Sequence, residues 1–385
     1  MNHTKLSNPM LPVDIVLAPA WWHRHEGLTF DEDFFYHPAK RVEAERRMEQ
    51  ALYERWGEFG LGSDHDKDLP QVGAVHLAAG FLLSEMLGCE VQYNEDTPPQ
   101  VLPANMDDLC VDLDAAFCSP AYLRFQQLAD ALKSQYGYLT GDVNWSGVLN
   151  LALDLRGERF FMDLYDRPDQ ARTFLKTIAK VVSRFISRIV KETGTTSISV
   201  NRTVRYFKEP ICLHSACSHT MISASDYENF FMPIDRNWGE KYAPYGIHYC
   251  GHDPHRHAEA FARLPRLDFL DVGWGGDVKQ LRKCLPNTFL NIRLSPVEII
   301  TQSTAEIREV ITRLVQDSGD PSLTGVCCVN MDDQVGDDKI TAIFETVRTL
   351  RQQYGPRHAD ANKDSPRYPE DSQIFYATEP DRQGK

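Results

Sequence analysis

The chain has 385 residues, of which 42% are hydrophobic and 25% are charged, the balance of a globular protein long enough to bury a full core. Lys and Arg number 41 against 55 Asp and Glu, which gives a formal net charge of −14. This acidic balance argues against extensive nucleic-acid binding, which needs a basic surface, and against docking on an anionic membrane.

The sequence carries no run of about 20 apolar residues, so no helix is expected to span a bilayer. The segment up to His23 lacks the continuous apolar stretch and the cleavage site of a secretory signal. The nine cysteines form an odd set spread along the chain, which is not typical of a disulfide framework. We therefore expect a cytoplasmic protein with free thiols.

The first part of the chain is predicted to be helical, with helices over residues 38–58, 71–87 and 120–136. Short apolar runs then alternate with amphipathic helices. The predicted strands are 90–93, 138–143, 197–200, 211–213, 246–250, 269–272, 289–293 and 326–329. The predicted later helices are 147–155, 166–193, 225–242, 254–264, 277–284, 304–316 and 337–353.

Strands separated by helices at this rhythm predict parallel βαβ units. About eight such strands favour an α/β fold of the TIM (β/α)8 barrel type. The barrel domain would span residues 1–354, with residues 1–88 as a helical N-terminal extension, and the polar segment 355–385 would form a flexible or surface-wrapping tail. The interval between residues 200 and 211 is too short for a helical crossover, so an open doubly wound sheet is the alternative.

The most informative motif is Gly246-Ile-His-Tyr-Cys-Gly251, a short strand that ends in His-x-Cys-Gly. Residues two apart on a strand point to the same face, so His248 and Cys250 can present an imidazole and a thiolate to one point. In a parallel barrel this point lies at the carboxyl-terminal rim, where active sites occur. Nitrogen and sulfur ligands of this kind suit zinc.

A third ligand is available in the last predicted strand, where Cys327 and Cys328 are adjacent. Neighbouring residues point to opposite faces of a strand, so at most one of the two faces the interior. Three protein ligands with an open fourth position are typical of catalytic zinc, which can take up a substrate thiol as a thiolate. The alternative is that these cysteines are ordinary buried core residues.

At this point the sequence resembles the uroporphyrinogen decarboxylase superfamily, and more closely its branch of zinc-containing, cobalamin-dependent methyltransferases. The resemblance starts from the Gly246–Gly251 motif and the Leu267–Gly273 strand with Asp277, and extends in collinear order over roughly residues 20–354. The further matching segments are Phe30–Pro38, Gly141–Gly147, Ala152–Gly157, Phe161–Pro168, Met221–Glu228, Phe231–Pro233, Leu294–Pro296 and Thr304–Ile307.

The resemblance implies a TIM barrel and a zinc ion held by a His-x-Cys pair and a distant cysteine. Carried over to this sequence, the pair is His248 and Cys250, and the distant ligand is Cys328, with Cys327 as the alternative. It also implies a corrinoid cofactor. Because the chain has no D-x-H-x-x-G cobalamin-binding segment, the corrinoid would arrive on a separate protein.

Two features depart from the family pattern. The residues after the distant cysteine, Val329–Gln334, are acidic and polar where the family is rich in proline. The arginine cluster with which true uroporphyrinogen decarboxylases hold an octa-acid is reduced to Arg24 in the segment 18–26, and an acidic protein without such a cluster is a poor receptor for eight carboxylates. Methyl transfer therefore ranks above decarboxylation.

Several other residues are candidates for the site. The candidate catalytic residues are Asp142, His214 and His219. Asp142 can equally cap a helix. The segment with His214, Cys217 and His219 suggests a rim loop or, less favoured, a second metal site. The indoles at positions 21 and 22 can line a pocket or simply pack the extension. The full set of candidate pocket residues is Trp21, Trp22, His23, Asn144, Trp145, Asp271, Trp274 and Arg293.

The sequence thus predicts a zinc-dependent methyltransferase that moves a methyl group between a corrinoid protein and a small thiol, folate or methylated substrate. One alternative is a metal-free decarboxylase-like lyase that uses Asp142 with Arg202, Arg205 and Arg293. A second alternative is a non-catalytic barrel that binds a small ligand. The partners expected are a small-molecule methyl donor or acceptor and a corrinoid protein, with no nucleic acid and no membrane; the oligomeric state is left open, with a homodimer among the options.

Overall fold

A computed structural model describes residues 10–63, 70–72, 80–141, 146–193, 207, 209 and 211–355. The predictions for Asp142, Asn144, Trp145, strand 197–200, Arg202, Arg205 and the tail beyond Gly355 fall outside these residues. None of the described helices is long and apolar enough to cross a membrane.

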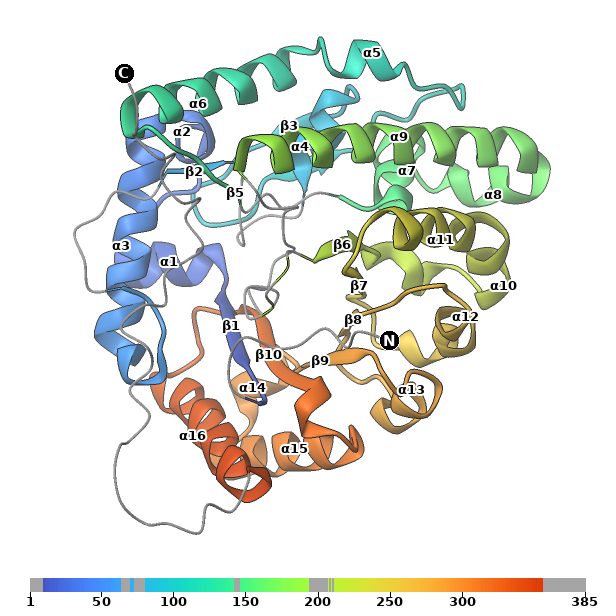
Figure 1. Ribbon diagram of the computed structural model, residues 1–385. Helices are drawn as coiled ribbons and strands as arrows, with labels where there is room; N and C mark the ends of the chain where they lie inside the picture. Colours follow the sequence, from blue (N-terminus) through green and yellow to red (C-terminus); the bar gives the residue numbers. More distant parts are fainter. Residues whose placement is uncertain are drawn as a thin grey trace, which may run out of the picture.

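The centre of the structure is a curled sheet of six parallel strands in the order β1-β10-β9-β8-β7-β6 (Figure 1). Nearly every residue of these strands is buried, because helices cover the outer face while side chains fill the inner face. Their bounds are β1 Val13–Leu17, β6 Cys212–Ser215, β7 Tyr245–His248, β8 Phe269–Val272, β9 Phe289–Arg293 and β10 Thr324–Met331.

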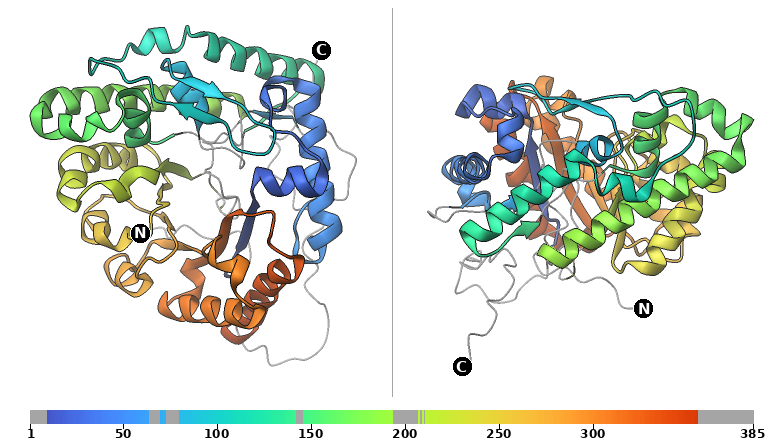
Figure 2. Two further views of the ribbon diagram at one scale, coloured as in Figure 1. Left: turned by 180° about the vertical axis from the view of Figure 1, so that it is seen from behind. Right: turned by 90° about the horizontal axis from the view of Figure 1, so that it is seen from above.

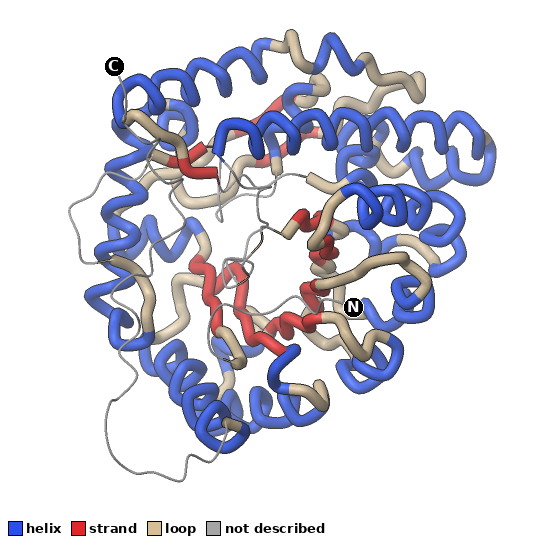
Figure 3. The backbone as a smooth tube through the Cα atoms, in the orientation of Figure 1, coloured by secondary structure: helices blue, strands red, loops and turns tan. Residues whose placement is uncertain are grey.

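Helices surround the strands on the outside, as the tube trace shows (Figure 3). The helices before β6 are α1 Pro19–Glu26, α2 Glu32–Tyr36, α3 Pro38–Trp56, α4 Phe81–Met86, α5 Leu113–Ala116, α6 Pro120–Tyr136, α7 Val148–Arg156, α8 Arg159–Asp166 and α9 Pro168–Thr193. Those after it are α10 Ala224–Asp226, α11 Met232–Lys241, α12 Ala258–Ala262, α13 Val278–Cys284, α14 Glu298–Thr301, α15 Thr304–Asp317 and α16 Asp337–Tyr354.

Short helical turns complete the described secondary structure. They are the 3₁₀ turns η1 Gly57–Phe59, η3 Cys217–Met221, η5 Pro254–His257 and η6 Pro321–Leu323, and the π-helical turn η4 Tyr227–Phe231, which joins α10 to α11. The turn η3 directly follows β6, so it lies at the carboxyl-terminal end of the sheet.

Two further pairs of strands stand apart from the main sheet. β2 (Gln71–Val72) pairs in parallel with β5 (Thr140–Gly141), and β3 (Glu90–Gln92) pairs antiparallel with β4 (Gln100–Leu102). In the described residues, hydrogen bonds between strands do not close an eight-stranded ring, so the structure shows a partial barrel (Figure 1). The prediction that 90–93 is a barrel strand is wrong, because those residues form a local hairpin.

The amino-terminal region differs from the helical extension predicted for residues 1–88. β1 enters the main sheet and pairs in parallel with β10, the last strand. Its five residues, four of them apolar and the other Asp14, are buried on both faces of the sheet, as is typical of a short strand inside a covered parallel sheet. The predicted helix 71–87 is also too long: a strand begins at Gln71, and the described helix covers only Phe81–Met86.

The other long helices agree closely with the predictions. α3, α6, α15 and α16 lie where apolar periodicity places them. The predicted helix 166–193 instead begins at Pro168, because α8 ends at Asp166 and Pro168 suits a new first turn. α9 contacts α7 and α8, and these green helices lie on the outside of the structure (Figure 2).

The two faces of the sheet carry different cores. The outer face and the helices share one large apolar cluster that includes Val326 and Cys328. The inner face holds two smaller clusters, one built on Phe207, Phe269 and Phe289, and one of Val16, Cys327 and Val329. Polar side chains on this inner face are therefore enclosed by the curl of the sheet.

Candidate metal centre

The carboxyl-terminal ends of β6 and β7 bring three ligand-type side chains together. The two strands are parallel, and Ser215 is the register partner of His248. Cys217, at the start of η3, lies two residues after Ser215, and Cys250, just beyond β7, lies two residues after His248. Because the chains run in the same direction at matched register, the two cysteines meet at the rim beside His248.

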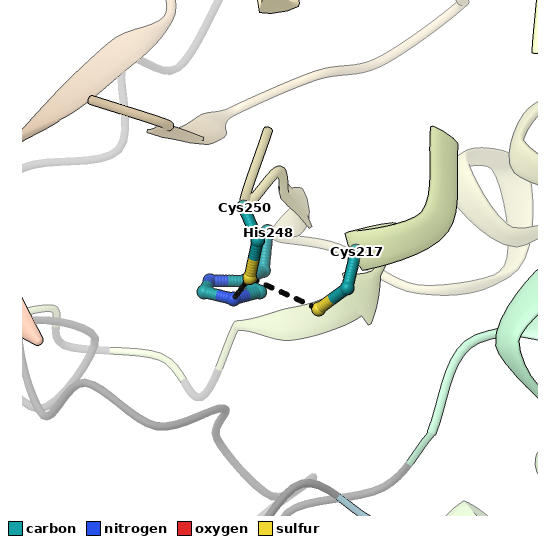
Figure 4. Close-up of side chains that lie close together, drawn as sticks. All are labelled: Cys217, His248 and Cys250. Carbon is teal, nitrogen blue, oxygen red and sulfur yellow. Dashed lines mark hydrogen bonds between the residues drawn. The ribbon is translucent and has the colours of Figure 1, made fainter. Parts of the chain in front are cut away.

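The three donor atoms form one compact group (Figure 4). The Sγ atoms of Cys217 and Cys250 are 3.0 Å apart, and the Nε2 atom of His248 is 2.7 Å from Sγ of Cys250. Zinc binds sulfur at about 2.3 Å and imidazole nitrogen at about 2.0 Å, so its ligand atoms lie less than about 4.6 Å apart. The donor types suit a single zinc ion. Tetrahedral ligands at these bond lengths lie about 3.5–3.8 Å apart, so the three donor atoms would move apart by less than about 1 Å to hold it.

Asp271 on β8 fixes the orientation of the imidazole. Its Oδ2 atom contacts Nδ1 of His248, and its Oδ1 atom accepts a hydrogen bond of 2.9 Å from Nδ2 of Asn291 on β9. All three side chains are buried. With Nδ1 held by a carboxylate, Nε2 is the nitrogen aimed at the two sulfurs, which is the usual outer support of a metal-binding histidine.

The electrostatics of the group favour a charged pair in the absence of metal. The hydrogen bond with the Cys217 thiol, together with the nearby cations of His248 and Arg293, lowers the pKa of Cys250 well below its usual value. Burial opposes charge on His248, but the Cys250 sulfur and the Asp271 carboxylate raise the pKa of His248 to about 9. The hydrogen bond with the Cys250 sulfur and the loss of solvent around the half-buried Cys217 raise the pKa of Cys217. These pKa shifts favour a thiolate at Cys250, an imidazolium at His248 and a thiol at Cys217.

Arg293, at the end of β9, is the cation beside this group. Its side chain is buried and faces the same interior as Cys327, its register partner on β10. Burial disfavours its charge, but the Cys250 sulfur and the Asp271 carboxylate raise the pKa of Arg293, which keeps the guanidinium protonated.

The structure places Cys327 and Cys328 outside the group of three. Cys327 faces the interior, where its thiol lies 3.8 Å from Oδ1 of Asp271 rather than beside the other sulfurs. Cys328 points to the opposite, helix-covered face of β10, where its thiol lies 3.8 Å from the Leu294 carbonyl oxygen. The preference for Cys328 as the distant ligand is therefore not supported, because alternation along β10 turns its side chain away from His248.

The predicted catalytic histidines 214 and 219 occupy a neighbouring buried layer. Nδ1 of His214 is 2.7 Å from Oδ1 of Asp235, and its Nε2 accepts a hydrogen bond of 3.3 Å from the backbone N–H of Val148. Both nitrogens of His214 are engaged in this packing. His219 lies edge-on to the ring of His214, and burial lowers the pKa of His219 to about 3, so it is neutral.

The aromatic residues at positions 21 to 23 pack α1 against its surroundings. Trp21 and Trp22 are fully buried, and Trp21 lies against Trp56 of α3 with Arg55 over its face. Nδ1 of His23 lies 3.0 Å from the Leu28 carbonyl oxygen. The structure thus shows packing contacts for these residues; a pocket role for them stays a prediction.

Asp271 and Trp274 were predicted as pocket residues at the end of β8. Asp271 is instead the orienting partner of His248. Trp274 lies on the rim, 37% exposed, with its ring 6.5 Å from that of His252. Between these two residues, Gly273 lets the segment after β8 approach the segment after β7, because a Cβ atom at Gly273 would lie 1.6 Å from the Gly251 carbonyl oxygen.

Cys217 is the member of this candidate group that the sequence assigns elsewhere, to a rim loop or a separate metal site with His214 and His219. The signal that identifies it is register. Once β6 and β7 are parallel neighbours, the residue two positions beyond Ser215 must meet the residue two positions beyond His248. Cys217 can therefore be identified as the third member of the group only when β6 and β7 are known to be neighbours.

These features define an α/β protein with a candidate metal centre at the strand ends. The chain matches the family model of uroporphyrinogen decarboxylase (URO-D) over residues 74–350. It therefore belongs to the uroporphyrinogen decarboxylase family, which confirms the resemblance seen in its sequence. No curated protein matches the chain by sequence.

Two solved structures are similar to this one. A methyltransferase from Methanosarcina mazei aligns with a TM-score of 0.62 at 12% identity, over 91% of this chain and 95% of that one. A B12-independent methionine synthase from Shewanella sp. W3-18-1, in complex with selenomethionine, aligns with a TM-score of 0.48 at 8% identity, over 89% of this chain and 99% of that one. At 12% identity, the first similarity shows a shared fold.

Proposed function

We propose that the protein is a zinc-dependent methyltransferase that moves a methyl group between a corrinoid protein and a small thiol, folate or methylated substrate. The observation that carries this proposal is the convergence of Cys217, His248 and Cys250 at the carboxyl-terminal ends of parallel strands. Active sites of barrel-type α/β proteins lie at this end. The fold shared with the methyltransferase from Methanosarcina mazei is in keeping with it.

The donor set suits zinc better than the other common cations. Thiolate and imidazole are the ligands that zinc prefers, whereas magnesium and calcium prefer oxygen. Cys217, His248 and Cys250 would hold the ion, and three protein ligands leave a fourth position for substrate. Zinc bound there would supply Lewis acidity, lowering the pKa of a substrate thiol so that it is a thiolate at neutral pH.

The chain's own residues prepare the site for this chemistry. Asp271 holds His248 with Nε2 facing the sulfurs, and Asn291 in turn holds Asp271. Two thiolates from Cys217 and Cys250 would balance the charge of a divalent ion. The acceptor thiol loses its proton and its sulfur forms a bond to the methyl carbon, while the bond from carbon to the donor breaks and its electron pair stays with the donor.

The methyl donor is proposed to be a corrinoid carried by another protein. This follows from the family resemblance and from the absence of a D-x-H-x-x-G segment in the sequence. The carrier would have to approach the carboxyl-terminal rim, because the candidate metal centre lies there. Methylcobalamin is the free analogue of such a carrier and serves as the donor in a first assay.

The proposal is tested by metal analysis and methyl transfer on the same preparations. Freshly purified, reduced protein should contain about one zinc per chain and should transfer methyl from methylcobalamin to a small thiol, followed by the visible spectrum of the corrinoid. His248→Ala and Cys250→Ala should lose both properties, whereas the matched control Cys212→Ala, whose thiol is buried at the start of β6, should keep them.

Metal-free protein that decarboxylates a porphyrinogen, with activity independent of His248 and Cys250, would overturn the proposal in favour of the lyase. Protein that binds zinc but transfers no methyl group from methylcobalamin or from a methylated corrinoid protein would also overturn it, and would leave the centre as a binding site.

A further inference from the structure

Arg293 stands out among the buried arginines of the described structure because it has no carboxylate partner. Arg41 and Arg156 are also buried, and each lies within 3.2 Å of a carboxylate oxygen, from Glu45 and Asp163 respectively. The side chain of Arg293 is 6% exposed. It interacts with the Cys250 sulfur, which raises its pKa, but its Nε and Nη1 atoms have no hydrogen-bond partner among the described residues.

Two buried N–H donors of a guanidinium without an acceptor are costly. Burying a charged group without hydrogen bonds is strongly unfavourable unless a counter-charge is supplied. Asp271, whose carboxylate acts electrostatically on Arg293, is already engaged through its two oxygens with His248 and Asn291. Among the described residues, the Nε and Nη1 groups of this cation have no acceptor, so a ligand can supply one.

The location of this cation ties it to the metal centre. Arg293 ends β9, and Asn291, two residues earlier on the same face, is the register partner of Asp271, which in turn pairs with His248. The guanidinium acts electrostatically on the Cys250 sulfur and on Asp271. A ligand that contacts the open position of the metal centre would thus have its other end near Arg293.

We propose that Arg293 binds a carboxylate of the substrate, so that the small molecule handled at this centre is a carboxylate-bearing thiol or its methylated form. This inference rests on the proposed function. A guanidinium presents N–H groups in a planar fork that matches the two oxygens of a carboxylate, and hydrogen bonds between charged groups are the stronger ones. The carboxylate would pair the Nε and Nη1 donors and orient the sulfur toward Cys217, His248 and Cys250.

The test uses a matched pair of probes, 3-mercaptopropionate and its amide, which have closely similar shapes but differ in charge. Binding to zinc-loaded protein is measured by calorimetry for the wild type, Arg293→Gln and Arg293→Lys, with zinc content determined for each preparation. The wild type should bind the acid at least about tenfold more tightly than the amide, the effect of a charge-assisted hydrogen bond pair. Arg293→Gln should lose this preference, so that the acid and the amide bind with equal affinity when both are compared at the same zinc content.

Arg293→Lys keeps the charge but not the planar fork, so it should show an intermediate preference. Equal affinity of the wild type for acid and amide would overturn the inference, as would an Arg293→Gln variant that still prefers the acid. If Arg293→Gln does not fold, the wild-type ratio and the Lys variant still decide the matter.

A second arm separates this inference from the proposed function. Propionate and propionamide, which lack a thiol, are titrated into metal-free protein and into Cys250→Ala. A preference for propionate that depends on Arg293 supports the carboxylate site even if no zinc is ever bound. Zinc binding and methyl transfer without any preference for the acid would retain the proposed function and overturn the carboxylate site alone.

Discussion

The contact between Asp271 and His248 gives a sharp prediction about metal affinity. Asp271→Asn keeps the size of the side chain and an oxygen for Asn291, but it removes the negative charge that faces Nδ1 of His248. Outer partners of a metal-binding histidine are typically worth 10–100-fold in affinity, which is about 1.4–2.8 kcal/mol. We expect the affinity for zinc to fall by this factor while the three ligands remain in place.

The assay is a zinc titration in competition with a chromophoric chelator, at constant pH and with reduced protein. Asp268→Asn is the matched control, since Asp268 directly precedes β8 and its carboxylate accepts a hydrogen bond of 2.9 Å from the backbone N–H of Tyr245, away from the metal centre. The control should bind zinc as the wild type does. An Asp271→Asn variant with wild-type affinity would refute the role assigned to this carboxylate.

Two further predictions concern packing and pH. Gly273→Ala would place a Cβ atom 1.6 Å from the Gly251 carbonyl oxygen, so the segment after Cys250 must shift. The affinity for zinc, measured by chelator competition, should drop, and the free energy of unfolding, measured in urea, should fall by about 1–3 kcal/mol. Wild-type values for both quantities would contradict the packing described. Asp235→Ala leaves His214 and two tyrosine hydroxyls without their acceptor, so unfolding free energy at pH 7 should fall by about 3 kcal/mol or more. Burial opposes charge on Asp235, but His214 and the tyrosine hydrogen bonds lower its pKa below 3.8. The stability that the Asp235 carboxylate contributes is therefore full above that pH and declines as the pH falls further. A difference in unfolding free energy between Asp235→Ala and the wild type that does not narrow in acid would contradict this.

Much of the fold follows from local pattern. The buried runs that form β7, β8, β9 and β10 are short and apolar, and the helices between them show clear periodicity, so both are evident in the sequence. The failures are at elements whose identity depends on distant partners. β1 is a strand because β10 offers it an edge, and residues 90–92 form a hairpin because a second strand lies ten residues on.

The candidate site divides in the same way. His248 and Cys250 converge because they are two residues apart at the end of β7, a spacing that the sequence shows directly. The third sulfur depends on which strands are neighbours. Cys217 follows β6, which lies beside β7, whereas Cys327 stands on β10, from which β7 is separated by β9 and β8. The spacing of cysteines along the chain does not contain this information.

The most direct test of the account is the zinc content and zinc affinity of three single variants, Cys217→Ser, Cys327→Ser and Cys328→Ser, purified and reduced under the same conditions. We predict that Cys217→Ser loses tight zinc binding, while Cys327→Ser and Cys328→Ser each retain about one zinc per chain. Retention of zinc by Cys217→Ser together with its loss from Cys327→Ser or Cys328→Ser would contradict the centre described here.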